Sequence, residues 1–253
     1  MVSKSGRGSQ QRAREQIARM RAEQARRLRR RLWLAGTLVV VLIAAVTAGI
    51  ALGTAGGGPS LPLGPLSTLG QLKPAPDAGA LGPEAVPEPA AAALAGPPAS
   101  VTGQAVDGIG CQTREQTVFH IHAHLTIVVN GAARQIPAAI GIPGGQAQST
   151  PQGPFVDTGT CFYWLHTHAA DGIIHIESPV HRTYTLGNFF DEWRQPLGPA
   201  QVGPALGRVV ALDNGQVYRG NPRDIPLTAH AQIQLEVGTP LVAPETITFP
   251  DGL

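Results

Sequence analysis

The stretch "HIHAHLTIVVNG", residues 120–131, alternates three histidines with apolar residues and ends in an Asn-Gly pair. Successive side chains of a β-strand point to opposite faces, so this alternation places the histidines on one face and the apolar side chains on the other. Asn130-Gly131 between two β-rich runs indicates a type I′ hairpin turn. The stretch therefore predicts a strand with its core-facing side chains at Ile121, Leu125, Ile127 and Val129, and with its histidines on the opposite face.

A second stretch, "LHTHAADGIIHIES" at residues 165–178, carries three more histidines and an acid. A hairpin that turns between Ala170 and Asp171 pairs His166 directly with His175, with a Cβ separation of about 4.5–5.5 Å. In this register His168 and Glu177 lie on the same face as that pair. Six of the eight histidines of the chain thus belong to two short stretches.

These stretches have the residue types and spacing of a metal site. A His-x-His pair on a strand can chelate one ion, and a third histidine from the adjoining strand leaves a position open. Imidazole suits Zn²⁺, Cu²⁺ and Fe²⁺, and a carboxylate at Glu177 adds the option of a two-histidine iron site. No methionine follows Met20, which excludes a thioether Cu(I) site beyond that residue. We expect zinc or copper, with iron as an alternative; the competing interpretation is a metal-free polar sheet face.

The candidate ligands are more numerous than one tetrahedral site needs. They are His166, His168, His175, Glu177, His120, His122 and His124. Either two ions bind, or some of these residues orient the true ligands through hydrogen bonds. The three histidines of the second stretch are the first candidates because one hairpin presents them, and those of the first stretch join them if the two hairpins are neighbours. Glu177 has a second candidate role as a general acid or base.

The remaining C-terminal sequence completes the expected fold. "TLGNFFDEWRQPLG" (185–198) predicts an amphipathic helix that Thr185 caps and Pro196 ends. Asn214-Gly215 predicts a third hairpin, and "HAQIQLEVG" (230–238) predicts a last strand. Two or three hairpins that form a sheet with one packed helix make an α+β, β-grasp-like fold our expectation. An all-β sandwich is the alternative.

The N-terminal region is expected to anchor the chain in a membrane. Residues 32–52 contain no charged residue and are long enough for a helix to cross a bilayer. Residues 1–31 carry eleven Lys or Arg against two Glu, whereas the rest of the chain carries eight against fifteen acidic residues. The positive-inside rule then predicts a basic cytoplasmic head (1–31), a transmembrane helix (32–52) and a C-terminal part outside the plasma membrane. A cleaved signal peptide is the alternative, for which both segments are long. No pattern indicates a nucleic-acid-binding fold in the basic head.

The C-terminal part divides into two further segments. Residues 53–100, rich in Pro, Ala and Gly, predict a disordered stalk that cannot bury a core. Residues 101–253 are the expected extracytoplasmic His-rich domain. Its two cysteines, Cys111 and Cys161, predict one disulfide in an oxidising compartment, with a thiolate metal ligand as the alternative.

Three patterns suggest a relationship to other proteins. They are "IHAHL…NG…IPA.IGI", "C.YWLHTH…G.IHIES" and "TLG.FF…W.QPL", which cover most of residues 111–200. They resemble a group of membrane-anchored extracytoplasmic proteins of high-GC Gram-positive bacteria. Ala169 stands where that pattern would place an acid after His168. The resemblance implies a membrane anchor but brings no established activity.

The function that we expect is metal binding at the cell envelope, by a single-pass membrane protein that handles copper or zinc. One alternative is a metal-dependent hydrolase or oxygenase, with Glu177 or Asp171 as the acid or base. Another is a metal-free interaction module. An enzyme needs an open coordination position and a carrier needs exchangeable ligands, whereas an interaction module needs neither.

Overall fold

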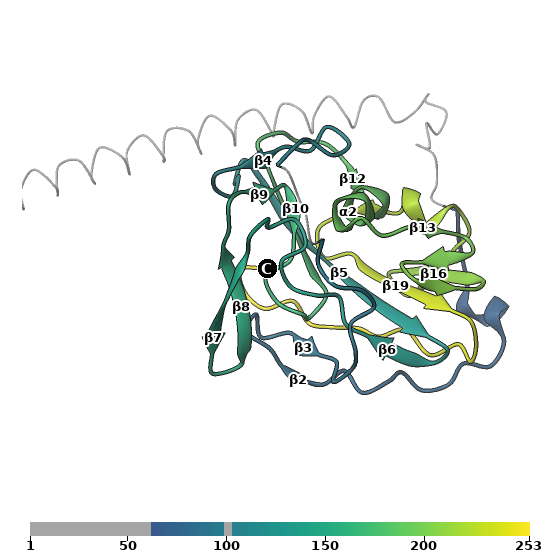
Figure 1. Ribbon diagram of the computed structural model, residues 1–253. Coiled ribbons are helices and arrows are strands. Elements are labelled where there is room, and N and C mark those ends of the chain that lie inside the picture. Colours follow the sequence, from purple (N-terminus) through teal and green to yellow (C-terminus); the bar gives the residue numbers. More distant parts are fainter. Residues whose placement is uncertain (1–61, 99–102) are drawn as a thin grey trace, which may run out of the picture. The chain divides into compact units, whose positions relative to one another are not determined.

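Eight strands form the main sheet, and the long strand β5 (Phe119–Val129) runs through its centre (Figure 1). Along one edge β5 pairs in parallel with β19 (Gln232–Val237). Along its other edge it pairs antiparallel with β11 (Ile173–Ser178) and β6 (Ala132–Arg134). The outer strands are β10 (Leu165–His166) next to β11 and, beyond β19, β16 (Val209–Asp213), β17 (Gln216–Tyr218) and β1 (Leu63–Gly64).

Several smaller sheets surround the main one, and the expected α+β, β-grasp-like fold is wrong. Strands are the dominant regular element of the described residues, which hold one short α-helix, α2 (Leu186–Trp193), so the architecture is closer to all-β. The reason is that the segments between the predicted hairpins form short paired strands and turns. The two- and three-stranded sheets are β2 (Ala80–Leu81) with β3 (Pro87–Glu88), β4 (Cys111–Gln112) with β9 (Phe162–Tyr163), β7 (Gln146–Thr150) with β8 (Gly153–Thr158), β12 (Tyr184–Thr185) with β18 (Pro226–Leu227), and β13 (Leu197–Gly198) with β14 (Gln201–Val202) and β15 (Ala205–Leu206); η1 (Leu66–Leu69) and η2 (Pro222–Asp224) are 3₁₀ turns.

The structure describes residues 62–98 and 103–253. The predicted basic head (1–31) and transmembrane helix (32–52) lie outside these ranges. Within the ranges, no helix has the length and hydrophobicity needed to cross a bilayer.

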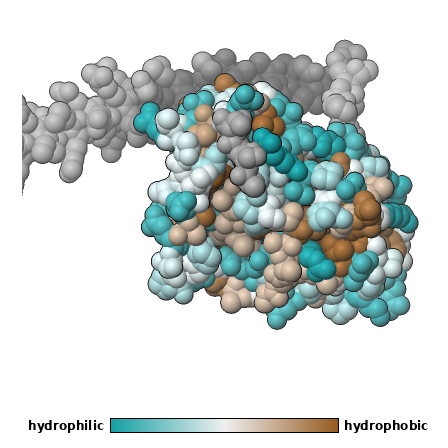
Figure 2. Space-filling model, in the orientation of Figure 1, coloured by the Kyte–Doolittle hydropathy of each residue, from teal (hydrophilic) through white to brown (hydrophobic). Residues whose placement is uncertain are grey.

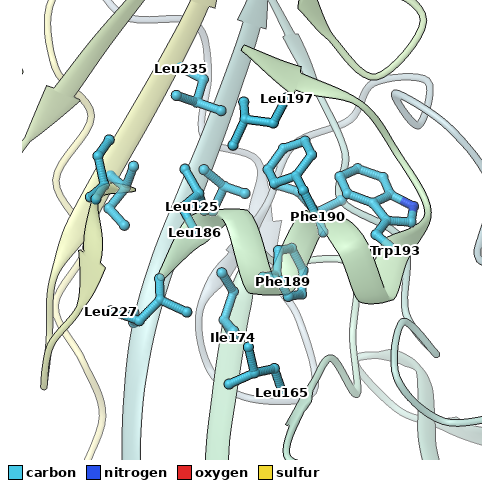
Figure 3. Close-up of a cluster of buried hydrophobic side chains, with 14 of the residues drawn as sticks. Leu125, Leu165, Ile174, Leu186, Phe189, Phe190, Trp193, Leu197, Leu227 and Leu235 are labelled. Atoms are coloured by element: carbon cyan, nitrogen blue, oxygen red, sulfur yellow. The ribbon is translucent and has the colours of Figure 1, made fainter. Parts of the chain in front are cut away.

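Helix α2 begins and ends close to where the sequence predicts. The Thr185 side chain accepts a hydrogen bond from the Asn188 backbone N–H, and the Asn188 side chain accepts one from Thr185 in return. The apolar face of the helix packs into the main hydrophobic core, next to β5, β10 and β11 (Figure 3). Phe189, Phe190 and Trp193 are fully buried there. Truncating one of these aromatic side chains to Ala costs about 3–5 kcal/mol of stability in a packed core.

The predicted hairpins are confirmed. Asn130 and Gly131 have φ values of 52° and 77° at the β5–β6 turn, and Asn214 and Gly215 have 48° and 73° at the β16–β17 turn. Positive φ at both central residues is what a type I′ turn requires. The last predicted strand is β19, which buries Leu235 and its apolar neighbours in the core.

The segment 62–98 differs from the disordered stalk expected there. It runs along the domain in blue in Figure 1, and its β1 pairs with β17. Backbone hydrogen bonds also hold it at Lys73, whose N–H donates to Leu241, and at Leu94, whose N–H donates to Gln135. Val86 is fully buried against Ile173 of β11. A Pro- and Gly-rich sequence has little propensity for structure by itself, but here pairing with the folded domain fixes it.

This covering changes the environment of the histidine face. Thr126 and Val128, which lie on that face of β5, are buried. Figure 2 shows hydrophobic and hydrophilic residues interspersed over much of the visible surface. Both faces of β5 are therefore buried from His122 to Val128, so His122 and His124 are part of the interior, whereas His120 near the start of the strand is exposed.

Candidate metal centre

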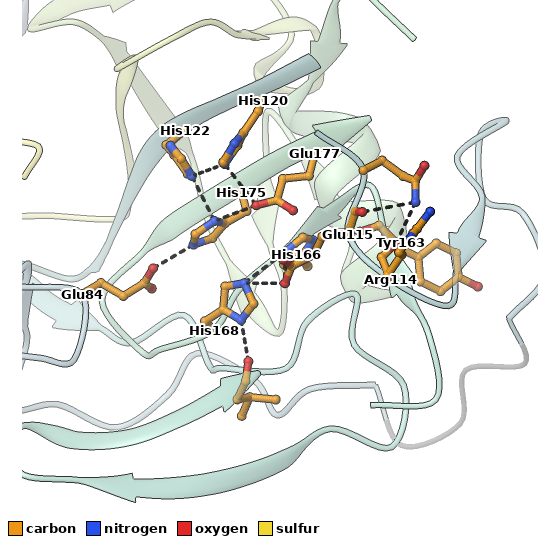
Figure 4. A network of polar contacts seen from close by, with 12 residues as sticks. Glu84, Arg114, Glu115, His120, His122, Tyr163, His166, His168, His175 and Glu177 are labelled. Carbon is orange, nitrogen blue, oxygen red and sulfur yellow. Dashed lines mark hydrogen bonds and ion pairs between the residues drawn. The ribbon is translucent and has the colours of Figure 1, made fainter. Parts of the chain in front are cut away.

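Strands β5, β11 and β10 bring the two histidine stretches together. His122 of β5 lies opposite His175 of β11, and His120 lies opposite Glu177. On the other edge of β11, His175 also pairs with His166, in the register that the hairpin predicts. Figure 4 shows these side chains converging in one cluster. The condition for the two stretches to act together, that the hairpins be neighbours, is met.

The first set of possible ligands consists of His120, His122, His175 and Glu177. His122 Nε2 lies 3.2 Å from His120 Nε2 and 3.0 Å from His175 Nδ1. Glu177 Oε1 lies 3.1 Å from His120 Nε2 and 3.6 Å from His175 Nδ1. All four ligand atoms lie within 4.8 Å of one another, close enough to hold one metal ion. Ligand atoms about 2.0–2.1 Å from a tetrahedral zinc ion are ~3.3 Å apart, which these distances bracket.

The second set lies beside the first and is built on β10 and the loop after it. His166 Nε2 and His168 Nε2 are 3.1 Å apart, and both side chains are buried. Glu115 Oε1 lies 3.5 Å from His168 Nε2 and 3.9 Å from His166 Nε2. The His166 ring stacks on the His175 ring with centroids 5.3 Å apart, so the two sets share a wall.

Two carboxylates in this cluster were not predicted from the sequence. Glu84 comes from the segment expected to be a stalk, and its Oε1 accepts a hydrogen bond of 2.8 Å from His175 Nε2. Glu115 lies on the loop after Cys111, and the Cys111–Cys161 disulfide ties that loop to the strands that carry the second set. The disulfide was predicted and is confirmed. Neither carboxylate follows a strand or helix period, so no sequence signal marked it.

The histidines of the cluster differ in charge. Burial, followed by the positive charge of His175, lowers the pKa of His122 to about 3. The same two causes lower the pKa of His166 and His168. These three rings are therefore neutral at pH 7, which is the form that binds metal.

His175 is the exception. Burial by itself would lower its pKa, but its interactions with the Glu177 and Glu84 carboxylates outweigh burial and raise the pKa to about 9. Without a metal, the ring is an imidazolium between two buried carboxylates. A divalent ion at Nδ1 would replace that proton and keep the charges balanced.

Two other candidates lie apart from both sets. His124 Nε2 donates to the Asp171 backbone oxygen at 2.9 Å, which engages it outside the cluster. Burial, followed by the negative charge of Glu84, raises the pKa of the Asp171 carboxyl to about 8, and its Oδ2 is buried without a hydrogen-bond partner. The remaining two histidines, His181 and His230, are exposed. The His181 ring is tilted against Phe119, and the His230 ring stacks on Phe249.

Comparison with known proteins adds nothing to this geometry: no family model, no curated protein and no solved structure matches the chain. The resemblance to membrane-anchored proteins of high-GC Gram-positive bacteria stays a prediction. The function has to be argued from the site itself.

Proposed function

We propose that this protein binds a transition-metal ion, zinc or copper, through His120, His122, His175 and Glu177. The observation that carries the proposal is the convergence of three imidazole nitrogens and one carboxylate oxygen, all within 4.8 Å of one another and with four of the separations at 3.0 to 3.6 Å. Three of the four side chains are buried, and the fourth, His120, is 38% exposed and leaves the ion a route to solvent.

Glu84 supports this proposal over a metal-free cluster. Metal-bound histidines usually donate their second ring N–H to a carboxylate or a backbone carbonyl, which fixes the tautomer and makes the ligand more basic. The bond from His175 Nε2 to Glu84 leaves Nδ1 as the atom that faces the other three ligands. Glu84 is thus placed to hold the His175 tautomer that metal binding at Nδ1 requires.

The donor atoms narrow the choice of metal. Imidazole nitrogen and carboxylate oxygen suit Zn²⁺, Cu²⁺ and Fe²⁺, and the described ranges hold no free thiol. Zinc and copper bind a set with three imidazoles well, whereas the facial iron site uses two. Iron therefore remains the alternative.

The proposal includes the cell envelope as the place of action. The uncharged segment 32–52 behind the basic cluster "RRLRRR" (26–31) supports a membrane anchor with the metal site outside. The Cys111–Cys161 disulfide agrees with an oxidising compartment. The bilayer is thus the proposed partner, together with the metal ion.

A metal-dependent enzyme is the second candidate function, and Asp171 favours it. A carboxyl with a pKa of about 8 is suited to exchange protons near neutral pH. Glu177 is less suited to that role because its Oε1 faces the metal ligands. The test is metal-dependent turnover of ester, phosphoester or O₂-dependent substrates. Turnover that Asp171→Asn abolishes, while the variant keeps its metal, would establish the enzyme.

The test of metal binding uses the full chain, purified in detergent without a histidine tag. Zinc, copper and iron are counted by elemental analysis in the wild type, His122→Gln and the matched control His181→Gln. We expect wild type and control to hold the same near-stoichiometric amount, and His122→Gln to hold about one equivalent less. Near-ultraviolet circular dichroism verifies that the variants are folded. A wild-type protein that carries no ion and takes up neither Zn²⁺ nor Cu²⁺ on titration would overturn the proposal.

A further inference from the structure

The contact between His166 and His168 is electrostatically unfavourable when no metal is bound. His166 Nδ1 lies 2.8 Å from the Tyr163 backbone oxygen, and His168 Nδ1 contacts the Val156 backbone oxygen. A carbonyl oxygen only accepts hydrogen bonds, so Nδ1 must carry the proton in both rings. In a neutral ring Nε2 then carries a lone pair and no proton.

These two lone pairs point at each other. The Nε2 atoms are 3.1 Å apart, and neither has a proton to donate while the rings are neutral. The pair lies in the interior, where His166 has no exposed surface and water cannot screen the repulsion. A cation next to both nitrogens turns the repulsion into two favourable contacts.

Two carboxylates are placed to complete the coordination of such a cation. Glu115 Oε1 already lies within 4 Å of both Nε2 atoms. Glu177 offers a ligand oxygen within 4.8 Å of those of His166 and Glu115. Its Oε2 is buried without a hydrogen-bond partner, while its Oε1 faces His120 and His175. The two oxygens of Glu177 can therefore serve two different ions.

His175 is close enough to His166 and His168 to be a ligand of this second group as well. Its Nε2, however, donates to Glu84, and its Nδ1 faces His122 at 3.0 Å. Both ring nitrogens thus already have partners, Glu84 at Nε2 and the first set at Nδ1. The second group is left with two histidines and two carboxylates.

We infer that the protein holds a two-metal centre, in which a second divalent transition-metal ion binds His166, His168 and Glu115 and in which Glu177 bridges the two ions. This inference rests on the proposed function, because the first ion shares Glu177. It gives a role to His166, His168 and Glu115, which a single tetrahedral site would not use. The three carboxylates around the cluster, Glu84, Glu115 and Glu177, offset most of the charge of two divalent ions.

The test titrates the metal-free full chain with Cu²⁺, because this ion reports both number and proximity. Bound Cu²⁺ is counted by equilibrium dialysis, and electron paramagnetic resonance detects magnetic coupling between two copper ions that share a bridging carboxylate. The variants are His168→Gln and Glu115→Gln for the second ion, and His122→Gln for the first. Glu115 is 38% exposed, so its substitution leaves the core intact. His124→Gln is the matched control, because His124 is buried on the same strand as His122, β5, but lies outside both sets.

We expect two bound ions with a coupled spectrum in the wild type and in His124→Gln. His168→Gln and His122→Gln should each bind one ion with an uncoupled spectrum, and Glu115→Gln should weaken the second ion about tenfold or more. One ion in the wild type that persists in His168→Gln and vanishes in His122→Gln would overturn the second site while the proposed function stands. Two ions without coupling would overturn the Glu177 bridge, and no bound ion would overturn both proposals.

Discussion

Replacing Glu84 by glutamine keeps an acceptor for His175 Nε2–H and removes its negative charge. The bond is 2.8 Å long and buried, with side-chain exposures of 7% and 6% for the two partners. A hydrogen bond to a charged group contributes about 1.5–3 kcal/mol and a neutral one about 0.5–1.5. The midpoints of these ranges differ by about 1.25 kcal/mol, which corresponds to nearly tenfold weaker metal binding when the proton does not compete.

Proton competition makes this prediction depend on pH. The pKa of His175 is about 9, so at pH 7 an ion must displace a proton that Glu84 helps to hold. Glu84→Gln removes one cause of that raised pKa and so also relieves the competition. The affinity loss in Glu84→Gln should therefore be close to tenfold at pH 9 and smaller at pH 7. Glu84→Ala removes the acceptor altogether and should approach a hundredfold loss at pH 9.

The assay is Zn²⁺ competition with a chromophoric chelator at both pH values, with the full chain in detergent. Val86→Ala loosens the packing of the same segment but leaves the carboxylate in place, so it controls for indirect effects. Glu245→Gln removes a carboxylate that contacts Thr126 rather than a histidine. Both controls should bind within about twofold of the wild type. Wild-type affinity in Glu84→Gln and Glu84→Ala at pH 9, or equal losses in Val86→Ala, would refute the reasoning.

Three further predictions concern pH, the disulfide and a buried acid. The raised pKa of His175 keeps its ring protonated up to about pH 9. Zn²⁺ binding should therefore release about one proton, and the Zn²⁺ affinity should rise about tenfold from pH 7 to pH 8. Chelator competition measures this, and the same affinity at both pH values would contradict it. Reduction of the Cys111–Cys161 disulfide should weaken binding of the ion at His168 and Glu115 more than binding of the first ion, because the disulfide holds the Glu115 loop. Equilibrium dialysis before and after reduction measures both affinities, and equal losses would argue against this prediction. Burial raises the pKa of Glu192 well above its usual value, and both its carboxyl oxygens lack partners. Its folded pKa exceeds the unfolded one, so the contribution of Glu192 to stability is fully present below about pH 4.5 and is lost, by up to about 1.4 kcal/mol per pH unit, as the pH rises above that value. Glu192→Gln should remove this contribution from the pH dependence measured by urea unfolding, and an unchanged pH dependence would be inconsistent with the buried acid.

Local pattern determined much of the strand structure. The alternation from His120 to Val129 indicated a strand whose apolar side chains face the main core, because a shift of one residue would turn the histidines toward it. The same pattern did not show that the histidine face is also largely buried. Asn130-Gly131 and Asn214-Gly215 fixed two turns, since their residues tolerate the positive φ that tight hairpins need. The pairing of His166 with His175 followed from the hairpin register alone. These are properties of neighbours in sequence, and they suffice to place five of the six histidines on strands, whereas His168 lies on the loop after β10.

Only the tertiary structure decided how the strands combine and which charges join them. The helix pattern was right, but one eight-residue helix does not make an α+β fold when the linking segments pair as short strands. Glu84 reaches His175 across 91 residues, and Glu115 approaches His168 because a disulfide and the β4–β9 pair bring its loop there. His124 lies on the same strand face as His122, yet its ring Nε2 donates a hydrogen bond to the backbone oxygen of Asp171. Periodicity specifies the face of a strand, whereas the partner of a side chain depends on long-range packing that no local pattern encodes.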